Sequence, residues 1–284
     1  DVQIRGFSLR LPLDIQFVFT ANPEDYTNRG SIVTPLKDRI GSQILTHYPE
    51  SLEIARTITE QETAEAVAEK ENVYVPELAK NILEQISFEA RENEFIDAKS
   101  GISARLSITA FQNLLSTAER RALQNGDEKT SVRLGDFTGI IPAITGKVEL
   151  VYEGEQEGAS GVAQQLIADA VKSQFMEYFP KIKKLQKEGE QQPYDDIVAW
   201  FFEQSGGFEL LDSLSDEDYK LQLDRIEPLD DLLERYVEDI PEEDVYFFKE
   251  FVLWALVEYR KLSKYHMTEG LRFKDVYGGY ISGL

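Results

Sequence analysis

A stripe of apolar residues with helical spacing is the feature that most constrains how this chain can fold. Leu78, Ile82, Ile86 and Ala90 recur every four residues after Pro76, a residue type that commonly begins a helix. This spacing predicts a helix with one buried face. Such a helix is stable mainly through the packing of that face against neighbouring elements, so the chain must supply further helices close by.

The neighbouring stretches predict those helices. Residues 51–70 form one candidate, because Ser51 is a suitable N-cap and glutamates stand near the positive end of the helix. Another is expected from residue 103 or 109 to about residue 124, and a short one within residues 134–150. We therefore expect residues 46–150 to form a small bundle of four helices.

The first 45 residues differ, because they contain short segments of β type. Residues 2–12 predict a small hairpin around Gly6, and residues 15–21, IQFVFTA, predict a strand buried on both faces of a parallel sheet. Pro23 would end that strand. Two further short elements are expected, a helix over residues 34–40 and a strand over residues 44–49.

Residues 151–284 predict a separate helical domain with an acidic surface. The stretch VYEGEQEGASG at its start is acidic and glycine-rich, which favours a linker or long loop. A helix is expected over residues 162–179. Residues 190–250 hold 20 Asp or Glu against 4 Lys or Arg, yet they also contain amphipathic or apolar segments expected to be helices. Those segments are IVAWFF, FELLDSL, LDDLLERYV and VYFFKEFVLWALVEY.

The composition excludes several kinds of site. The chain has no cysteine, which removes thiol nucleophiles, disulfides and cysteine zinc sites, and it has only His47 and His266 for imidazole chemistry. We therefore expect no metal site. A net charge of −22 disfavours nucleic acid and anionic membranes as partners, and no run of 18 apolar residues occurs. The lack of cysteine fits a reducing compartment, so we expect a cytoplasmic protein.

The sequence contains no complete phosphate-binding loop. The nearest match to G-x-x-x-x-G-K-[ST] is IPAITGKV, in which Ile141 replaces the first glycine and Val148 replaces the hydroxyl residue. No strand-like segment ends in a consecutive acidic pair that would hold magnesium. The 284 residues alone are therefore not expected to hydrolyse a nucleotide. Because ordered segments begin directly at Asp1, we expect the chain to be part of a longer protein.

Three other motifs give the chain a resemblance to a known family. They are FVFTANP at residues 17–23, LKDRIG at 36–41 followed by YP at 48–49, and GISAR at 101–105. With these motifs, residues 1–150 resemble the C-terminal half of an AAA+ ATPase module, in the branch of MoxR proteins and the magnesium-chelatase ATPase subunit. The resemblance implies a mainly α chain in which residues 1–45 end an α/β core and residues 46–150 form the helical lid. The acidic helical domain expected over residues 151–284 lies outside the resemblance.

The resemblance also implies a role for one residue in each motif. Asn22 corresponds to the sensor-1 residue, which orients a water against the γ-phosphate of ATP. Arg39 corresponds to the arginine finger, which stabilises charge in the site of a neighbouring subunit. Arg105 corresponds to the sensor-2 arginine of the lid, which responds to the phosphate. ATP and Mg²⁺ are the implied cofactors, and the implied assembly is a hexameric ring that remodels a client protein or inserts a metal into it.

Each of these residues also has an ordinary interpretation. Asn22 suits a strand-ending turn, Arg39 suits a local ion pair with Asp38, and Arg105 suits a solvated helix position. Arg29, in the same loop, competes with Arg39 for the finger role. If the lid assignment holds, we expect Arg105 to be at least partly exposed and to point toward the end of the Asn22 strand.

Two functions of other classes stay open at this point. One is a non-catalytic interaction module, in which the acidic helical part docks a basic partner or a metal-carrying client. The other is a sigma-factor-directed transcriptional activator, against which the acidic C-terminal part argues. A lysine cluster over residues 181–187 is a weaker candidate for an anion or partner contact, and a solvated helix end explains it as well.

Overall fold

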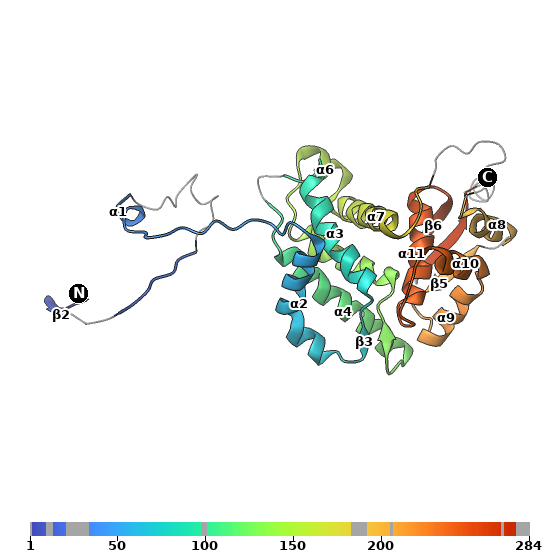
Figure 1. Ribbon diagram of the computed structural model, residues 1–284, viewed down its shortest axis with the longest axis horizontal. Helices are drawn as coiled ribbons and strands as arrows, with labels where there is room; N and C mark the ends of the chain where they lie inside the picture. The colour runs from blue at the N-terminus through green and yellow to red at the C-terminus, as the bar shows by residue number, and fades with distance from the viewer. Residues whose placement is uncertain are drawn as a thin grey trace. The chain divides into compact units, whose positions relative to one another are not determined.

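The computed structural model describes residues 2–9, 14–20, 34–97, 101–182, 192–204, 207–267 and 270–276. The chain divides into two units, Asp1–His47 and Tyr48–Leu284. Helices make up most of the regular structure in the described residues (Figure 1), which confirms the mainly α part of the expected fold class.

The first unit contains the predicted hairpin. Strand β1 (Val2–Ile4) pairs antiparallel with β2 (Phe7–Leu9) across a two-residue turn. Arg5 and Gly6 both have positive φ, 52° and 86°, as a type I′ turn requires. The predicted short helix is also present, as α1 (Thr34–Lys37).

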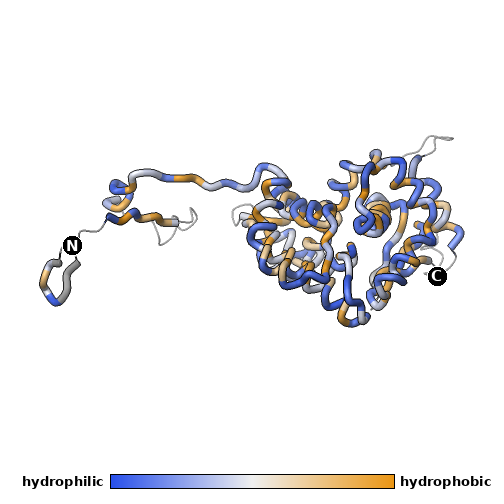
Figure 2. Tube along the Cα trace, turned by 60° about the horizontal axis from the view of Figure 1, so that its bottom comes forward, coloured by the Kyte–Doolittle hydropathy of each residue, from blue (hydrophilic) through white to orange (hydrophobic). Residues whose placement is uncertain are grey.

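The two longer strands expected near the start of the chain are not formed. Residues 14–20 and 40–49 adopt neither helix nor strand, and apolar side chains such as Phe17 and Val18 are 71% and 81% exposed. Figure 2 shows apolar stretches in orange along the N-terminal part of the chain. A strand buried on both faces needs paired neighbours and covering layers, and the described part of this unit offers only the hairpin and the four-residue helix α1. The strand predictions over 15–21, as far as residue 20, and over 44–49 are therefore wrong.

The second unit begins with three helices that lie side by side (Figure 1): α2 (Leu52–Glu69), α3 (Glu77–Glu92) and α4 (Arg105–Asn125). Ser51 caps α2 as predicted, because its Oγ accepts a hydrogen bond from the Ile54 amide at 3.3 Å. All four residues of the apolar stripe on α3 are buried. The short fourth helix is a 3₁₀ helix η2 (Leu134–Ile140) that continues into α5 (Ile141–Thr145). The four helices predicted over residues 46–150 are thus confirmed as elements.

The acidic, glycine-rich stretch after residue 150 is not a linker. It forms α6 (Tyr152–Glu157) and the start of α7 (Ala159–Tyr178). Gly154 is buried, and a Cβ there would lie 2.5 Å from the carbonyl oxygen of Phe95. The Val151 amide donates to the same oxygen at 3.0 Å. The glycine therefore serves close packing rather than flexibility, and the linker prediction is wrong.

The C-terminal part contains helices and a small sheet. The helices are α8 (Asp195–Glu203), α9 (Asp216–Asp224), α10 (Glu227–Tyr236) and α11 (Val245–Glu258). The strands β5 (Phe208–Leu211), β6 (Leu262–Met267) and β7 (Gly270–Asp275) form an antiparallel sheet in the order β5-β7-β6. The FELL segment was expected to be helical, and this is wrong, because the alternate residues Phe208 and Leu210 are buried as in a strand with one covered face. This sheet lies beside the helices expected over residues 151–284 and was not predicted.

One continuous hydrophobic core runs through the second unit. It includes α3, α7 and α11, and α7 packs against both of the others. Phe175 of α7 lies at the centre, with its ring 4.9 Å from that of Phe179 and 5.8 Å from that of Phe251, measured between centroids. Residues before and after position 150 both contribute to this core. The expected domain boundary at residue 150 stays a prediction. Phe201 of the IVAWFF segment is buried, whereas the adjacent Phe202 is 68% exposed.

A parallel pairing of two residues connects the helices of the first half. Strand β3 (Val73–Tyr74) pairs with β4 (Thr130–Ser131), which brings the chain after α4 next to the chain before α3. This contact places η2 beside α4 and opposite α11, where the buried charges described below gather.

Candidate functional site

The sequence-predicted site residues fall in different parts of the molecule. Asn22 and Arg29 lie outside the described residues. Arg39 follows α1 in the first unit, is exposed, and donates from Nη1 to the Pro35 carbonyl at 3.1 Å. Arg105 is in the second unit. The finger and sensor-1 assignments therefore stay predictions.

Arg105 is the first residue of α4, and its side chain is exposed. The two residues that follow it, Leu106 and Ser107, are buried at 1% and 2% exposure. The Ser107 hydroxyl lies 2.7 Å from that of Ser87 on α3. The helix start is thus anchored on its inner side while the arginine faces solvent, which confirms the expected exposure but says nothing of its direction relative to Asn22.

Two of the three family-like motifs meet directly in the second unit. The Ile102 amide of GISAR donates to the hydroxyl oxygen of Tyr48, the tyrosine of the YP pair, at 3.0 Å. Gly101 has a φ of +69°, and a Cβ on it would lie 2.6 Å from that same oxygen. The positive φ therefore favours glycine at position 101, and a Cβ there would force the Tyr48 hydroxyl to shift. Ile102 itself is 3% exposed and joins the core.

An arginine of α3 completes this contact. The guanidinium carbon of Arg91 lies 4.4 Å from the ring centroid of Tyr48 and 5.0 Å from that of Phe88, distances at which a cation is attracted to a ring face. Burial lowers the pKa of Arg91, and Tyr48 and the carboxylate of Glu84 act in the opposite direction. Arg91 therefore holds the tyrosine ring from the side while Ile102 holds its hydroxyl.

A second cluster of buried polar groups lies between α4, η2 and the C-terminal part. Arg121 of α4 forms a two-pronged pair with Asp136, with Nε 3.0 Å from Oδ1 and Nη2 2.9 Å from Oδ2. Arg121 also donates to the Thr130 hydroxyl at 3.0 Å and to the Ser131 carbonyl at 2.8 Å. Asp136 accepts a third bond, from the Arg133 amide at 2.8 Å. Arg121 and Asp136 are both 5% exposed, so this is a buried ion pair with nearly complete hydrogen bonding.

Glu250 of α11 extends this cluster to η2 and α9. Its carboxylate accepts from the amides of Leu134 and Gly135, at 2.7 and 3.0 Å, and from the hydroxyl of Tyr219 at 2.7 Å. Burial raises the pKa of Glu250, although the Tyr219 hydroxyl and the Leu134 amide act against that rise. The pKa of Tyr219 is also raised, by burial first and then by the charge of Glu250.

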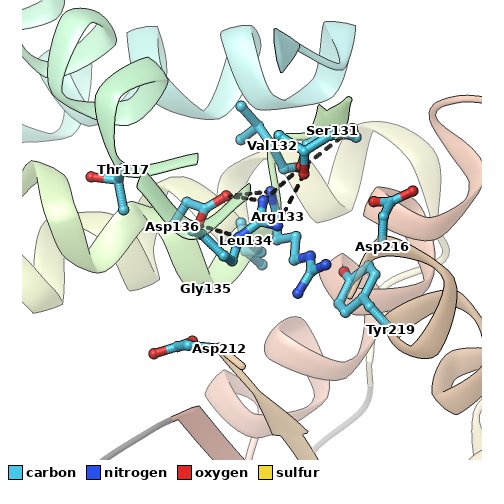
Figure 3. Close-up of polar contacts among 12 residues, drawn as sticks. Thr117, Ser131, Val132, Arg133, Leu134, Gly135, Asp136, Asp212, Asp216 and Tyr219 are labelled. Atoms are coloured by element: carbon cyan, nitrogen blue, oxygen red, sulfur yellow. Dashed lines mark hydrogen bonds and ion pairs between the residues drawn. The ribbon is translucent and has the colours of Figure 1, made fainter. Parts of the chain in front are cut away.

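Arg133 joins the cluster from the opposite side. Figure 3 shows its side chain extending toward Tyr219, and its guanidinium carbon lies 4.1 Å from the tyrosine ring centroid. Its Nη2 donates to the carbonyls of Leu214 and Ser215 at 3.1 and 3.2 Å, while its buried Nε has no hydrogen-bond partner. Burial lowers the pKa of Arg133, and the nearby charge of Arg121 lowers it further.

A cavity of about 20 Å³ lies among these side chains and is lined by Gly135 and Asp212, both labelled in Figure 3. That volume holds about one water molecule, so it excludes a nucleotide or an organic substrate. Partial burial raises the pKa of Asp212, and the charge of Asp136 adds to the rise. We therefore interpret this cluster as a structural connection between the two halves of the unit.

Charged residues on otherwise apolar helix faces are the sequence signal for this cluster. Arg121 lies seven residues after Leu114 on the apolar face of α4, and Glu250 interrupts the apolar run of α11. Charged residues at buried positions of a helix predict partners elsewhere in the fold. The pattern could not say which partners.

The remaining candidates give little chemistry. His47 is exposed, and the side chain of His266 lies outside the description. Of the lysine cluster, Lys181 alone is described, and it is exposed. Within the described ranges, no group of three or more His, Asp or Glu residues is arranged to hold a metal ion. Nor does any helix in the described part of the chain have the length and apolar composition needed to cross a membrane.

No protein-family model matches the chain, and no significantly similar curated protein or solved structure was found.

Proposed function

We propose that this chain supplies the sensing side of the ATP site in a ring-forming AAA+ ATPase of the MoxR and magnesium-chelatase type. In this proposal Asn22 orients the attacking water, Arg39 acts as the arginine finger, and Arg105 responds to the phosphate. ATP and Mg²⁺ are the cofactors, and a phosphate-binding loop must come from residues other than these 284. The ring, a hexamer, uses ATP hydrolysis to remodel a cytoplasmic client protein or to insert a metal into it.

One observation carries this proposal. The YP and GISAR motifs, 53 residues apart in the sequence, form a single hydrogen-bonded structure through Tyr48 and Ile102. That structure precedes α4 directly, and the exposed Arg105 is the first residue of this helix. An exposed guanidinium on a rigid helix start is suited to contact a phosphate, because arginine offers several donors in a fixed geometry. The helices α2, α3, α4 and η2–α5 supply the small bundle that a lid requires.

The proposal is tested by ATP turnover of the full-length gene product. Arg105→Ala is expected to lower kcat/KM about 10- to 100-fold, the value of one hydrogen bond from a charged group to the phosphate. Arg120→Ala is the matched control, because Arg120 is also an exposed arginine of α4, and it should leave turnover unchanged. Absence of ATP turnover in the wild-type gene product, or equal turnover in both variants, contradicts the proposal.

A different observation favours a second function, a non-catalytic docking module. Acidic residues fill the first turn of α9 and recur along α10, while the one lysine on the facing side of α11, Lys249, is 2% exposed and already paired with Asp224 and Asp230. Lys220 also pairs with Asp216, but acidic residues still outnumber basic ones on α9 and α10, and this excess of negative charge suits a basic client surface. This function predicts client binding that weakens with salt and needs no nucleotide, whereas the ATPase predicts binding that changes with ATP.

A further inference from the structure

Tyr48 stands at a distinctive place in the chain. It is the first residue of the second unit, directly after a segment, residues 41–47, with exposed side chains and no regular structure. It is also the residue that contacts the loop in front of α4, through the hydrogen bond from the Ile102 amide. Any change in the path of the chain entering the unit therefore acts first on this tyrosine.

The contact is built from three sides, and each has its own physical cause. Arg91 lies over the tyrosine ring. Its Nε is buried without a hydrogen-bond partner, so the attraction to the ring face offsets part of the cost of burying the guanidinium. Gly101 approaches the hydroxyl so closely that no side chain fits. The Ile102 side chain is buried in the core, and its backbone amide donates to the Tyr48 hydroxyl. These contacts hold a tyrosine that is itself 46% exposed.

The position of Arg105 depends on this contact. The Leu106 amide donates to the Ser103 carbonyl at 3.0 Å, so the first turn of α4 begins within the segment that Ile102 anchors. The N-cap residue, Ala104, offers no side-chain cap, so the preceding loop constrains the helix start together with the buried Leu106 and Ser107. When the loop loosens, the exposed Arg105 loses its defined direction first.

We propose that Tyr48 is a positioning residue that holds the Gly101–Ser103 loop, and through it Arg105, in the conformation that responds to ATP. This makes the contact a regulatory element, because displacement of the chain before Tyr48 releases the sensor arginine. The role in ATP response rests on the proposed function above. The Tyr48 contact with the loop does not.

The first test addresses the contact alone, in the 284-residue chain. Tyr48→Phe removes one hydroxyl and retains the ring under Arg91. Amide hydrogen exchange at Ile102 should become roughly 3- to 10-fold faster, the value of one ordinary hydrogen bond. Tyr74→Phe is the matched control, since the Tyr74 hydroxyl donates to Asp244 at 2.7 Å elsewhere in the same unit and should leave Ile102 unchanged. Equal exchange at Ile102 in wild type and Tyr48→Phe overturns the proposal.

The second test asks whether Tyr48 acts through Arg105, in the full-length gene product. Tyr48→Phe should lower kcat/KM for ATP, and the Tyr48→Phe/Arg105→Ala double variant should be no worse than Arg105→Ala alone. A residue that merely stabilises the fold would instead add its loss to that of Arg105→Ala. Additive losses therefore overturn the positioning role. No turnover by the wild type overturns the proposed function and with it the ATP role of Tyr48, while the exchange result still decides the contact.

A second variant covers the case in which deletion of the hydroxyl alone changes exchange at Ile102 only slightly. Gly101→Ala places a Cβ 2.6 Å from the Tyr48 oxygen at a φ of +69°, so it displaces the tyrosine and strains the loop together. It should accelerate exchange at Ile102 more than Tyr48→Phe does. The reverse order contradicts the geometry on which the proposal rests.

Discussion

Removal of the Asp136 carboxylate tests the buried cluster most directly. Asp136→Ala takes away both oxygens that pair with Arg121, at 3.0 and 2.9 Å, and the acceptor of the Arg133 amide, at 2.8 Å. Arg121 stays 95% buried unless the surrounding helices move, because its own exposure is 5%. Its remaining partners, the Thr130 hydroxyl and the Ser131 carbonyl, carry no charge.

The expected cost follows from these contacts. Breaking a buried ion pair by removing one partner costs about 3–5 kcal/mol, and an orphaned buried amide costs about 1–3 kcal/mol more. Part of the second cost overlaps the first, so we expect a loss of roughly 4–6 kcal/mol in the free energy of unfolding. Domains have only about 5–15 kcal/mol in total, so the variant should be close to unfolding at 25 °C.

Urea unfolding followed by circular dichroism and by the fluorescence of Trp200 and Trp254 measures this loss. The matched control is Lys220→Ala, which breaks an exposed pair with Asp216 at 2.7 Å and should cost no more than about 1 kcal/mol. The double variant Arg121→Leu/Asp136→Leu should be more stable than Asp136→Ala, because it leaves no unpaired buried charge. A loss from Asp136→Ala as small as that of the control refutes the interpretation of this cluster as a buried pair.

Two further predictions concern helix packing and pH. Gly139→Ala should lower the free energy of unfolding by about 1–3 kcal/mol, measured by urea titration, because the new Cβ would lie 2.1 Å from the Thr117 hydroxyl, whereas Gly161→Ala, in open space on α7, should not destabilise the chain. Glu84 accepts from Thr59 at 2.6 Å, and burial raises its pKa above the ordinary value. Its stabilising contribution is therefore fully present below the unfolded-state pKa and is lost as pH rises through the raised folded-state pKa. The stability of wild type relative to Glu84→Gln should thus fall as the pH rises above the ordinary glutamate pKa of 4.5, measured by urea titration at a series of pH values, and a rise contradicts the assignment.

The parts of the fold that the sequence predicted are those with a repeating local cause. The stripe on α3 and the Ser51 cap of α2 depend on neighbours within a few residues, so their spacing is visible in the sequence. The FELL segment is too short to show such a repeat, and its four residues fit a strand and a helix equally well. Its choice of strand depends on β7, more than 50 residues further along the chain. The strand expected over residues 15–20 also depends on a partner elsewhere in the chain. The described part of its unit supplies no such partner, so the strand does not form.

The candidate site shows the same limit at the level of single residues. The motifs indicated that Tyr48, Gly101 and Arg105 belong to one pattern, but no spacing rule indicates that the Tyr48 oxygen occupies the place of a Gly101 side chain. The buried charges were missed for a related reason. Arg121 and Glu250 are visible as charges on apolar faces, yet their partners come from other elements and are fixed only when the core forms.

The buried charges also decide how the helices of residues 46–150 can move. Glu250 of α11 binds the amides at the start of η2, and Asp244, just before α11, accepts bonds from Tyr74 at 2.7 Å and from the Glu77 amide at 3.2 Å. Both connections join residues before position 150 to the acidic C-terminal part, and each is buried enough that breaking it leaves an unsatisfied charge. A motion that kept the C-terminal part still while the helical bundle turned would have to break both. Under the proposed function, a response of Arg105 to ATP therefore moves the acidic surface together with the bundle, which gives a client bound to that surface a direct mechanical link to the nucleotide.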